Sequence, residues 1–226
     1  VVPLDEEGRI SELSRIIGGI EITDAIRATA SALSKSLPTL RTPCPRWKNW
    51  RTCFPIMEKN MSFDTVITCH ANADNDAMAC LVGALVLYPG AALLFPGSQE
   101  KQVQDFYDDV IEPLYPCVGS RDLDGAEGKP LVLVDGHHPR RFPHVKKVLE
   151  REDVELHIWD HHPLADDEDD LGRQLAERAA AGRIEKVGAS STLIVEELVR
   201  RGIEPTCEYA TSLAAGIYGD TGSLLY

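Results

Sequence analysis

The sequence predicts an α/β fold in which helices cover both faces of a parallel sheet. From residue 63 onward, short apolar segments alternate with longer segments of helical periodicity. This alternation is typical of right-handed crossovers between parallel strands. In addition, several of the apolar segments are followed directly by Asp and His residues. Since open parallel sheets bind ligands at the carboxyl ends of their strands, these residues are candidates for a functional site.

The predicted elements follow from hydrophobic periodicity and from capping residues. Strands are expected at residues 66–68, 91–95, 131–134 and 154–159. Helices are expected at residues 76–88, 98–112, 145–151, 171–181, 190–201 and 207–218. The helix at residues 76–88 is almost wholly apolar, so we expect it to be buried on most sides.

The first 60 residues lack this alternation. Residues 1–36 contain two short helical segments separated by Gly18 and Gly19, and residues 37–60 form a linker rich in Pro, Trp and basic residues. The stretch RISELSRIIGGIEITDAIRATA resembles the C-terminal tail of RecN-type DNA repair ATPases, without their nucleotide-binding elements, so it implies no ATPase activity. We therefore expect a helical tail, either a simple appendage or a fusion with a neighbouring repair gene, followed by a folded domain at residues 61–226.

The composition disfavours several classes of protein. A net charge of −13 argues against a general nucleic-acid binder, because phosphate backbones are bound through a surplus of Lys and Arg. An acidic protein that acts on phosphates needs metal ions to reverse the local field. The six cysteines form no Cys-x-x-Cys pair, which indicates reduced thiols and a cytoplasmic protein. No membrane association is expected, since the sequence contains neither an 18-residue apolar run nor a signal-like leader.

Four groups of Asp and His residues lie at predicted strand or helix ends. Three of them follow the strands at 66–68, 131–134 and 154–159, and the fourth lies in a Gly-rich turn after the last helix. Their members are His70, Asp74 and Asp76; Asp135; Asp160, His161 and His162; and Asp220. Each group alone has an ordinary interpretation as a helix cap or turn. Together, they predict one shared site for metal ions or phosphate.

The DHH phosphoesterase superfamily has four ordered motifs, and this chain resembles all of them: His70-Ala-Asn-Ala-Asp74-Asn-Asp76, Asp135, Asp160-His161-His162 and Gly-Asp220-Thr-Gly-Ser. That superfamily includes manganese pyrophosphatases, exopolyphosphatases, RecJ-type exonucleases and oligoribonucleases. Residues 87–101 further resemble the DHH module of bacterial proteins that continue into CBS domains and a poly(A)-polymerase-like nucleotidyltransferase. The resemblance covers about residues 63–226 and implies the N-terminal, parallel-sheet domain of the superfamily.

The resemblance implies two cation sites that share a bridging carboxylate. The first cation would be held by His70 and Asp74, the second by Asp76, His161 and Asp220, and the bridge would be Asp135. Oxygen and imidazole ligands without thiolate suit Mn²⁺, with Mg²⁺ as an alternative. Two such ions would activate a water molecule and hold a phosphoryl group in line for its attack.

The resemblance also implies residues that contact the substrate or support the ligands. His162 would contact a phosphoryl oxygen, and Asp160 would orient a ligand imidazole. Further substrate contacts are expected from Asn72, Gly188, Ser190, Ser191 and Thr192. The chain departs from the pattern at Ala73, where the family has Pro, and at His137 and His138, which could compete as ligands or contact the substrate.

These residues lead to two functional hypotheses. The first is a manganese-dependent phosphoesterase core that hydrolyses a phosphodiester or phosphoanhydride in an oligonucleotide, a nucleic-acid end or a polyphosphate. The second is a truncated, non-catalytic metal- or nucleotide-binding module of a longer tRNA nucleotidyltransferase-like protein, with CBS or nucleotidyltransferase domains as its partners. Family members continue into a second domain that closes over the site, and this sequence contains none of it. We therefore expect weak or no hydrolysis by this chain alone.

Overall fold

The computed structural model describes residues 63–225 with gaps at 101–102, 105–106, 108–114, 120–122, 124–128 and 165–169. The predicted tail at residues 1–36, the predicted linker at residues 37–60 and most of the predicted helix at residues 98–112 lie outside the described residues. Within the described ranges, no helix has the length and apolar character needed to cross a membrane.

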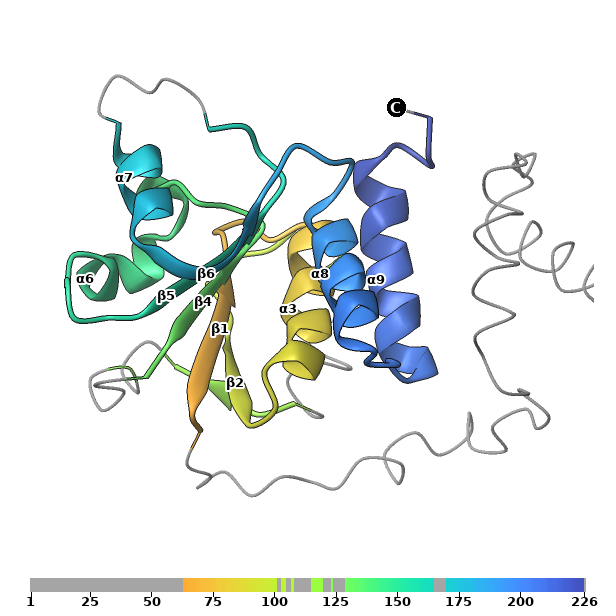
Figure 1. The fold of residues 1–226 in the computed structure, drawn as a ribbon, viewed down its shortest axis with the longest axis horizontal. Helices are drawn as coiled ribbons and strands as arrows, with labels where there is room; N and C mark the ends of the chain where they lie inside the picture. The colour runs from red at the N-terminus through yellow and green to blue at the C-terminus, as the bar shows by residue number, and fades with distance from the viewer. Residues whose placement is uncertain are drawn as a thin grey trace, which may run out of the picture. The chain divides into compact units, whose positions relative to one another are not determined.

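A six-stranded parallel sheet forms the centre of the described part (Figure 1). The strand order is β3-β2-β1-β4-β5-β6, and every neighbouring pair is parallel. The strands are β1 (Thr65–Cys69), β2 (Ala91–Leu94), β3 (Cys117–Val118), β4 (Leu131–Val134), β5 (Leu156–Asp160) and β6 (Ala179–Ile184). The predicted parallel α/β class is therefore confirmed, and so are its four predicted strands, while β3 and β6 were not predicted.

Helices cover both faces of this sheet, as predicted. One face carries α3 (Asn75–Leu87), α8 (Ser190–Arg201) and α9 (Cys207–Asp220) (Figure 1). The other face carries α6 (Lys146–Leu149) and α7 (Leu171–Glu177), and two 3₁₀ turns, η4 (Pro139–Arg141) and η5 (Pro143–Val145), precede α6.

The strands supply apolar side chains to two separate cores. Ile67 and Val132 pack into the core with α3 and α8, whereas their neighbours Val66 and Leu131 pack into the core on the other face, together with Phe142. Successive side chains of a strand point to opposite faces, so a strand that is covered on both sides needs a continuous apolar sequence. This requirement explains why β1 and β4 could be predicted from the sequence.

The predicted helix at residues 171–181 is wrong beyond residue 177. The helix ends at Glu177, and the Ala-rich segment that follows pairs with β5 as the edge strand β6. Alanine has the highest intrinsic helix propensity, but propensities differ by less than about 1 kcal/mol per residue, and backbone pairing with a neighbouring strand outweighs this preference. Gly182 has a φ of +105°, and a Cβ atom there would lie 1.9 Å from the carbonyl oxygen of Ile158. This position of β6 therefore requires glycine.

Helices α3 and α9 pack closely because small residues line their contact. A Cβ atom on Gly83 would lie 2.5 Å from Leu213, and one on Gly216 would lie 2.6 Å from the Cβ atom of Ala79. The predicted Gly-rich turn begins later than expected, since Gly216 and Gly219 lie inside α9, Asp220 is its last residue, and only Gly222 lies in the turn that follows. The close approach brings this end of α9 to the start of α3.

Candidate metal centre

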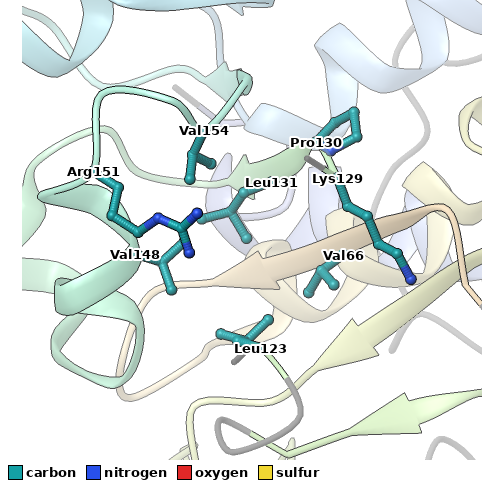
Figure 2. A pocket seen from close by; sticks show the side chains of 8 residues that line it. All are labelled: Val66, Leu123, Lys129, Pro130, Leu131, Val148, Arg151 and Val154. Atoms are coloured by element: carbon teal, nitrogen blue, oxygen red, sulfur yellow. The ribbon is translucent and has the colours of Figure 1, made fainter. Parts of the chain in front are cut away.

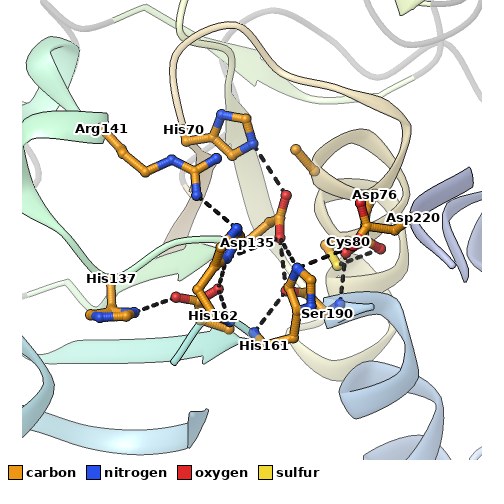
Figure 3. A network of polar contacts seen from close by, with 12 residues as sticks. His70, Asp76, Cys80, Asp135, His137, Arg141, His161, His162, Ser190 and Asp220 are labelled. Atoms are coloured by element: carbon orange, nitrogen blue, oxygen red, sulfur yellow. Dashed lines mark hydrogen bonds and ion pairs between the residues drawn. The ribbon is translucent and has the colours of Figure 1, made fainter. Parts of the chain in front are cut away.

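The predicted site residues lie close together where the order of the strands in the sheet reverses, between β1 and β4. The chain continues from β1 to β2 and β3 on one side, whereas β4, β5 and β6 lie on the other side. At such a switch point the connections diverge from the carboxyl ends of two central strands and leave a crevice there. His70 follows β1, Asp135 follows β4 and Asp160 ends β5, so all three lie at the carboxyl ends of the strands. Figure 3 shows His70 and Asp135 side by side there.

Asp135 occupies the middle of the group. Its carboxylate is 2% exposed, with Oδ2 at 3.1 Å from His70 Nε2 and Oδ1 at 3.6 Å from His161 Nε2. Ser190 donates a hydrogen bond of 2.8 Å to Oδ1. The backbone of Asp135 has a φ of +56°, a left-handed conformation that is uncommon outside glycine. One carboxylate oxygen thus faces each of the two predicted cation sites.

The first candidate cation site contains His70, Asp74 and Asp135, whose ligand atoms lie within 4.8 Å of one another. Asp74 caps α3 by accepting a 3.0 Å hydrogen bond from the amide of Ala77. His70 Nδ1 lies 2.7 Å from the carbonyl of Ala71, to which it donates when the ring is neutral. Nε2 then carries the lone pair that a metal needs, and it points toward the two carboxylates.

The second candidate site contains Asp76, His161 and Asp220, whose ligand atoms also lie within 4.8 Å of one another. His161 Nε2 lies 3.2 Å from Asp220 Oδ2, while its Nδ1 lies 3.2 Å from the carbonyl of Val187. A third combination of Asp135, His161 and His162 meets the same distance limit. The side chains predicted as metal ligands are therefore brought together, and their roles as ligands stay a prediction.

The N-terminus of α8 holds the carboxylate of Asp76. The backbone amide of Ser190 donates to Oδ2 at 2.6 Å, and the amide and hydroxyl of Ser191 donate to Oδ1 at 3.0 and 2.5 Å. A helix N-terminus favours a negative charge, because its first amides lack partners within the helix. Here, those amides fix a predicted metal ligand.

Negative charge is concentrated at the centre. Burial, with the nearby charge of Asp135, raises the pKa of Asp76 to about 7. Burial also raises the pKa of Asp220, and the charges of Asp135 and Asp74 act in the same direction. Burial alone would lower the pKa of His70, but the contacts with Asp135 and the carbonyl of Ala71 outweigh it and raise that pKa. Crowded carboxylates beside imidazole nitrogens match the donors that bind divalent cations such as Mn²⁺.

Asp160 connects two imidazoles next to this centre. Its Oδ1 accepts from His162 Nδ1 at 2.7 Å, and its Oδ2 pairs with His137 Nδ1. Burial of Asp160 raises its pKa, but the hydrogen bonds with His137 and His162 outweigh burial and hold the pKa well below its usual range. Arg141 Nη1 in turn lies 3.1 Å from His162 Nε2 (Figure 3).

Three contacts of this network were missed by sequence reasoning. His137 binds Asp160, and it belongs to none of the ligand groups found among the described residues. His138 accepts from the amide of Arg140 and caps η4. Neither was predicted to have such a role, and Arg141 was not singled out at all. Its signal in the sequence is a Pro-Arg-Arg turn shortly after the predicted bridging acid.

The residues predicted to bind substrate divide by exposure. Asn72 and Gly188 are exposed, whereas Ser190 and Ser191 are fully buried and contact Asp76 or Asp135. Thr192 is partly buried in the first turn of α8, where its amide donates to the carbonyl of Ala189. The substrate-binding roles of these residues stay a prediction.

Ala73, at the position where the resemblance led us to expect proline, has a local structural role. The amide of Ala73 donates to the carbonyl of Ser98, and the amide of Glu100 donates to the carbonyl of Ala73. Proline has no N–H and could not make the first of these bonds. The loop that carries Asp74 is therefore anchored by backbone pairing.

A separate hollow lies at the opposite ends of the central strands (Figure 2). Its lining contains no Asp or His and consists of Val66, Leu123, Lys129, Pro130, Leu131, Val148, Arg151 and Val154. Val66 and Leu131 are near the starts of β1 and β4, whereas the Asp and His cluster follows their ends. This hollow is not part of the candidate metal centre.

The fold and the site together define a parallel α/β protein with a candidate centre for divalent cations at its topological switch point. No protein-family model matches the chain. It is 39% identical over 161 residues to an A-adding tRNA nucleotidyltransferase of Geobacter sulfurreducens and 34% identical over 170 residues to one of Aquifex aeolicus. Each match covers 71% of this chain, which spans only 17% of the length of either relative.

A solved structure shares the fold. It is that of an exopolyphosphatase-related protein from Bacteroides fragilis, with a TM-score of 0.54 and 16% sequence identity. The match covers 72% of this chain and 47% of that protein. At this level of identity, the likeness establishes the architecture.

Proposed function

We propose that residues 63–225 are the core of a DHH-type phosphoesterase, which uses two Mn²⁺ ions to hydrolyse a phosphodiester or phosphoanhydride. The observation that carries this proposal is the position of Asp135, whose two carboxylate oxygens face His70 on one side and His161 on the other. A bridging carboxylate between two ligand groups is the arrangement that two-metal hydrolysis needs. The shared fold with an exopolyphosphatase-related protein supports the same class of reaction.

The protein's own residues would bind the cations and align the substrate. His70, Asp74 and Asp135 would hold one ion, and Asp76, His161 and Asp220 the other, with Asp135 shared. When bound, the ions would supply an activated water and stabilise charge on the phosphoryl group. Asp160 fixes the ring of His162 through Nδ1, while Nε2 faces Arg141. Ser190 and Ser191 keep the carboxylates of Asp135 and Asp76 in place.

The substrate of this reaction would be a phosphate-containing small molecule or a short nucleic acid. A net charge of −13 repels long polyanions, and bound cations would make the centre locally attractive to one phosphoryl group. We place this activity in the cytoplasm, which the buried, reduced thiols of Cys69 and Cys80 support.

Hydrolysis assays with Mn²⁺ test this function. Pyrophosphate, a dinucleotide, a cyclic dinucleotide and an oligonucleotide are the substrates to be compared. We expect turnover of at least one, reduced by at least about 100-fold in Asp135→Asn, because the shared carboxylate contacts both sites. Asp153→Asn is the matched control, since Asp153 is an exposed acid that pairs with Arg151 on the surface. Equal turnover in Asp135→Asn and the wild type would contradict the proposed mechanism.

A second candidate is a non-catalytic metal- or nucleotide-binding module of a longer tRNA nucleotidyltransferase-like protein. The two A-adding tRNA nucleotidyltransferases favour it, because each is about six times as long as the segment that this chain matches. CBS and nucleotidyltransferase domains would then be its partners within the longer product. Mn²⁺ binding that depends on Asp135, with no turnover of any of the four substrates, would support this candidate over the enzyme.

A further inference from the structure

We propose that Arg141 is a substrate-binding residue, which holds non-bridging oxygens of the phosphoryl group that enters the metal centre beside His162. The inference rests on the proposed function and deepens it, because it identifies the group that binds the anionic part of the substrate. None of the six predicted ligands is a cation, so neutralisation of the substrate by the protein itself requires another residue.

Arg141 differs from most of the described arginines, although Arg178, which donates to the backbone carbonyls of Leu149 and Arg151, also forms no ion pair within the described ranges. Five arginines form ion pairs with carboxylates: Arg151, Arg173, Arg183, Arg200 and Arg201. For Arg141, no carboxylate within the described ranges lies at ion-pair distance, and its side-chain contact is with His162 Nε2. A guanidinium that has no carboxylate partner in the described part of the chain, in a protein with a net charge of −13, is suited to an external anion.

The contact with His162 uses little of the capacity of Arg141. A guanidinium has five N–H donors in a planar fork and cannot accept, so Arg141 donates to His162 Nε2 over 3.1 Å. His162 Nδ1 donates in the opposite direction, to Asp160. The remaining donors of Arg141 match the spacing of two phosphate oxygens, which are stronger acceptors than an imidazole.

The backbone around Arg141 is fixed on both sides. Its carbonyl accepts a 2.8 Å hydrogen bond from the amide of Ala71, next to the predicted ligand His70, and its amide donates to the carbonyl of His138. The following residue, Phe142, is fully buried, and a Cβ atom on Gly136 would lie 3.1 Å from its ring. The turn therefore presents the guanidinium at the metal centre without a large loss of conformational freedom on binding.

Binding of inorganic phosphate to the Mn²⁺-loaded protein tests this role without requiring turnover. We expect the phosphate affinity of Arg141→Gln to be about 10- to 100-fold lower than that of the wild type, which is the usual effect of a hydrogen bond to a charged group. Arg141→Lys should recover part of the loss, since it keeps the charge but not the fork. Arg173→Gln, which removes a surface ion pair, is the control and should bind phosphate normally.

Titration of the same variants with Mn²⁺ alone separates phosphate binding from a structural role. Arg141→Gln should bind Mn²⁺ as the wild type does and should unfold at a similar temperature, because Arg141 is not a metal ligand. Equal phosphate affinity in Arg141→Gln and the wild type would overturn the proposal, and so would a parallel loss of Mn²⁺ affinity. Failure of the wild type to hydrolyse any substrate would instead refute the proposed function, and the phosphate titration would still decide the role of Arg141.

Discussion

Removal of metal ions should make the stability of this protein fall as pH rises, because Asp76 is a buried carboxylate beside Asp135. The pKa of Asp76 is raised from 3.8 to about 7 in the folded protein. The folded protein therefore binds a proton more tightly than the unfolded chain does. Between pH 4 and pH 7 the unfolded chain has released this proton while the folded protein still holds it, so the free energy of unfolding decreases as the pH rises toward 7. A difference of about three pKa units corresponds to a decrease on the order of 4 kcal/mol.

Denaturant unfolding of chelator-treated protein at pH 4.5, 6 and 7.5 measures this decrease. Other groups titrate in the same range. The contribution of Asp76 is therefore the decrease in the free energy of unfolding from pH 4.5 to pH 7.5 in the wild type minus the same decrease in Asp76→Asn. We expect this difference to be about 2–4 kcal/mol across the range, and excess Mn²⁺ to restore the wild type at pH 7.5, since the ion binds only the folded centre. Equal slopes in the wild type and Asp76→Asn would refute the reasoning.

Three further results are expected. Gly216→Ala should weaken Mn²⁺ binding at least about 10-fold, because the new Cβ would lie 2.6 Å from Ala79, whereas Gly219→Ala, with no contact under 3.4 Å, should bind normally in the same calorimetric titration. Gly182→Ala should prevent folding of the domain, because its Cβ would lie 1.9 Å from a backbone oxygen. A thermal melt of this variant should then show no cooperative unfolding transition. Burial lowers the pKa of His144 from 6.5 to about 4, so stability should fall by about 1–2 kcal/mol from pH 7 to pH 4 after allowance for its partial exposure. Denaturant unfolding of His144→Gln at pH 7 and pH 4 should lack this part of the decrease in the free energy of unfolding.

The sequence was sufficient for elements that are buried on both sides. β1, β4 and the helix α3 are almost wholly apolar, and their identity depends little on context. β3 has only two residues, too few for any period, and β6 is an Ala-rich edge strand whose composition favours helix. Both segments are strands because they pair with β2 and β5, respectively, and the local sequence contains no sign of this pairing.

The positions of the predicted ligands could be inferred from sequence motifs, and their proximity could be inferred from the order of the strands. The predicted ligands meet because β1, β4 and β5 are neighbours whose carboxyl ends lie at one edge. The contact of His137 with Asp160 and that of Arg141 with His162 depend on the path of the chain through η4. No residue pattern specifies that path, so these contacts required the structure.

The long separation of its ligands along the chain determines when the metal centre can form in a cell. His70 and Asp220 lie near opposite ends of the described domain, 150 positions apart in the sequence. At a synthesis rate of about 5–20 residues per second, the ribosome needs roughly 8–30 s to pass from one to the other. During that interval Asp76 lacks the amides of α8 that hold it. The candidate centre is therefore complete only after α9 has been synthesised, and the proposed cation binding would be a late event of biogenesis.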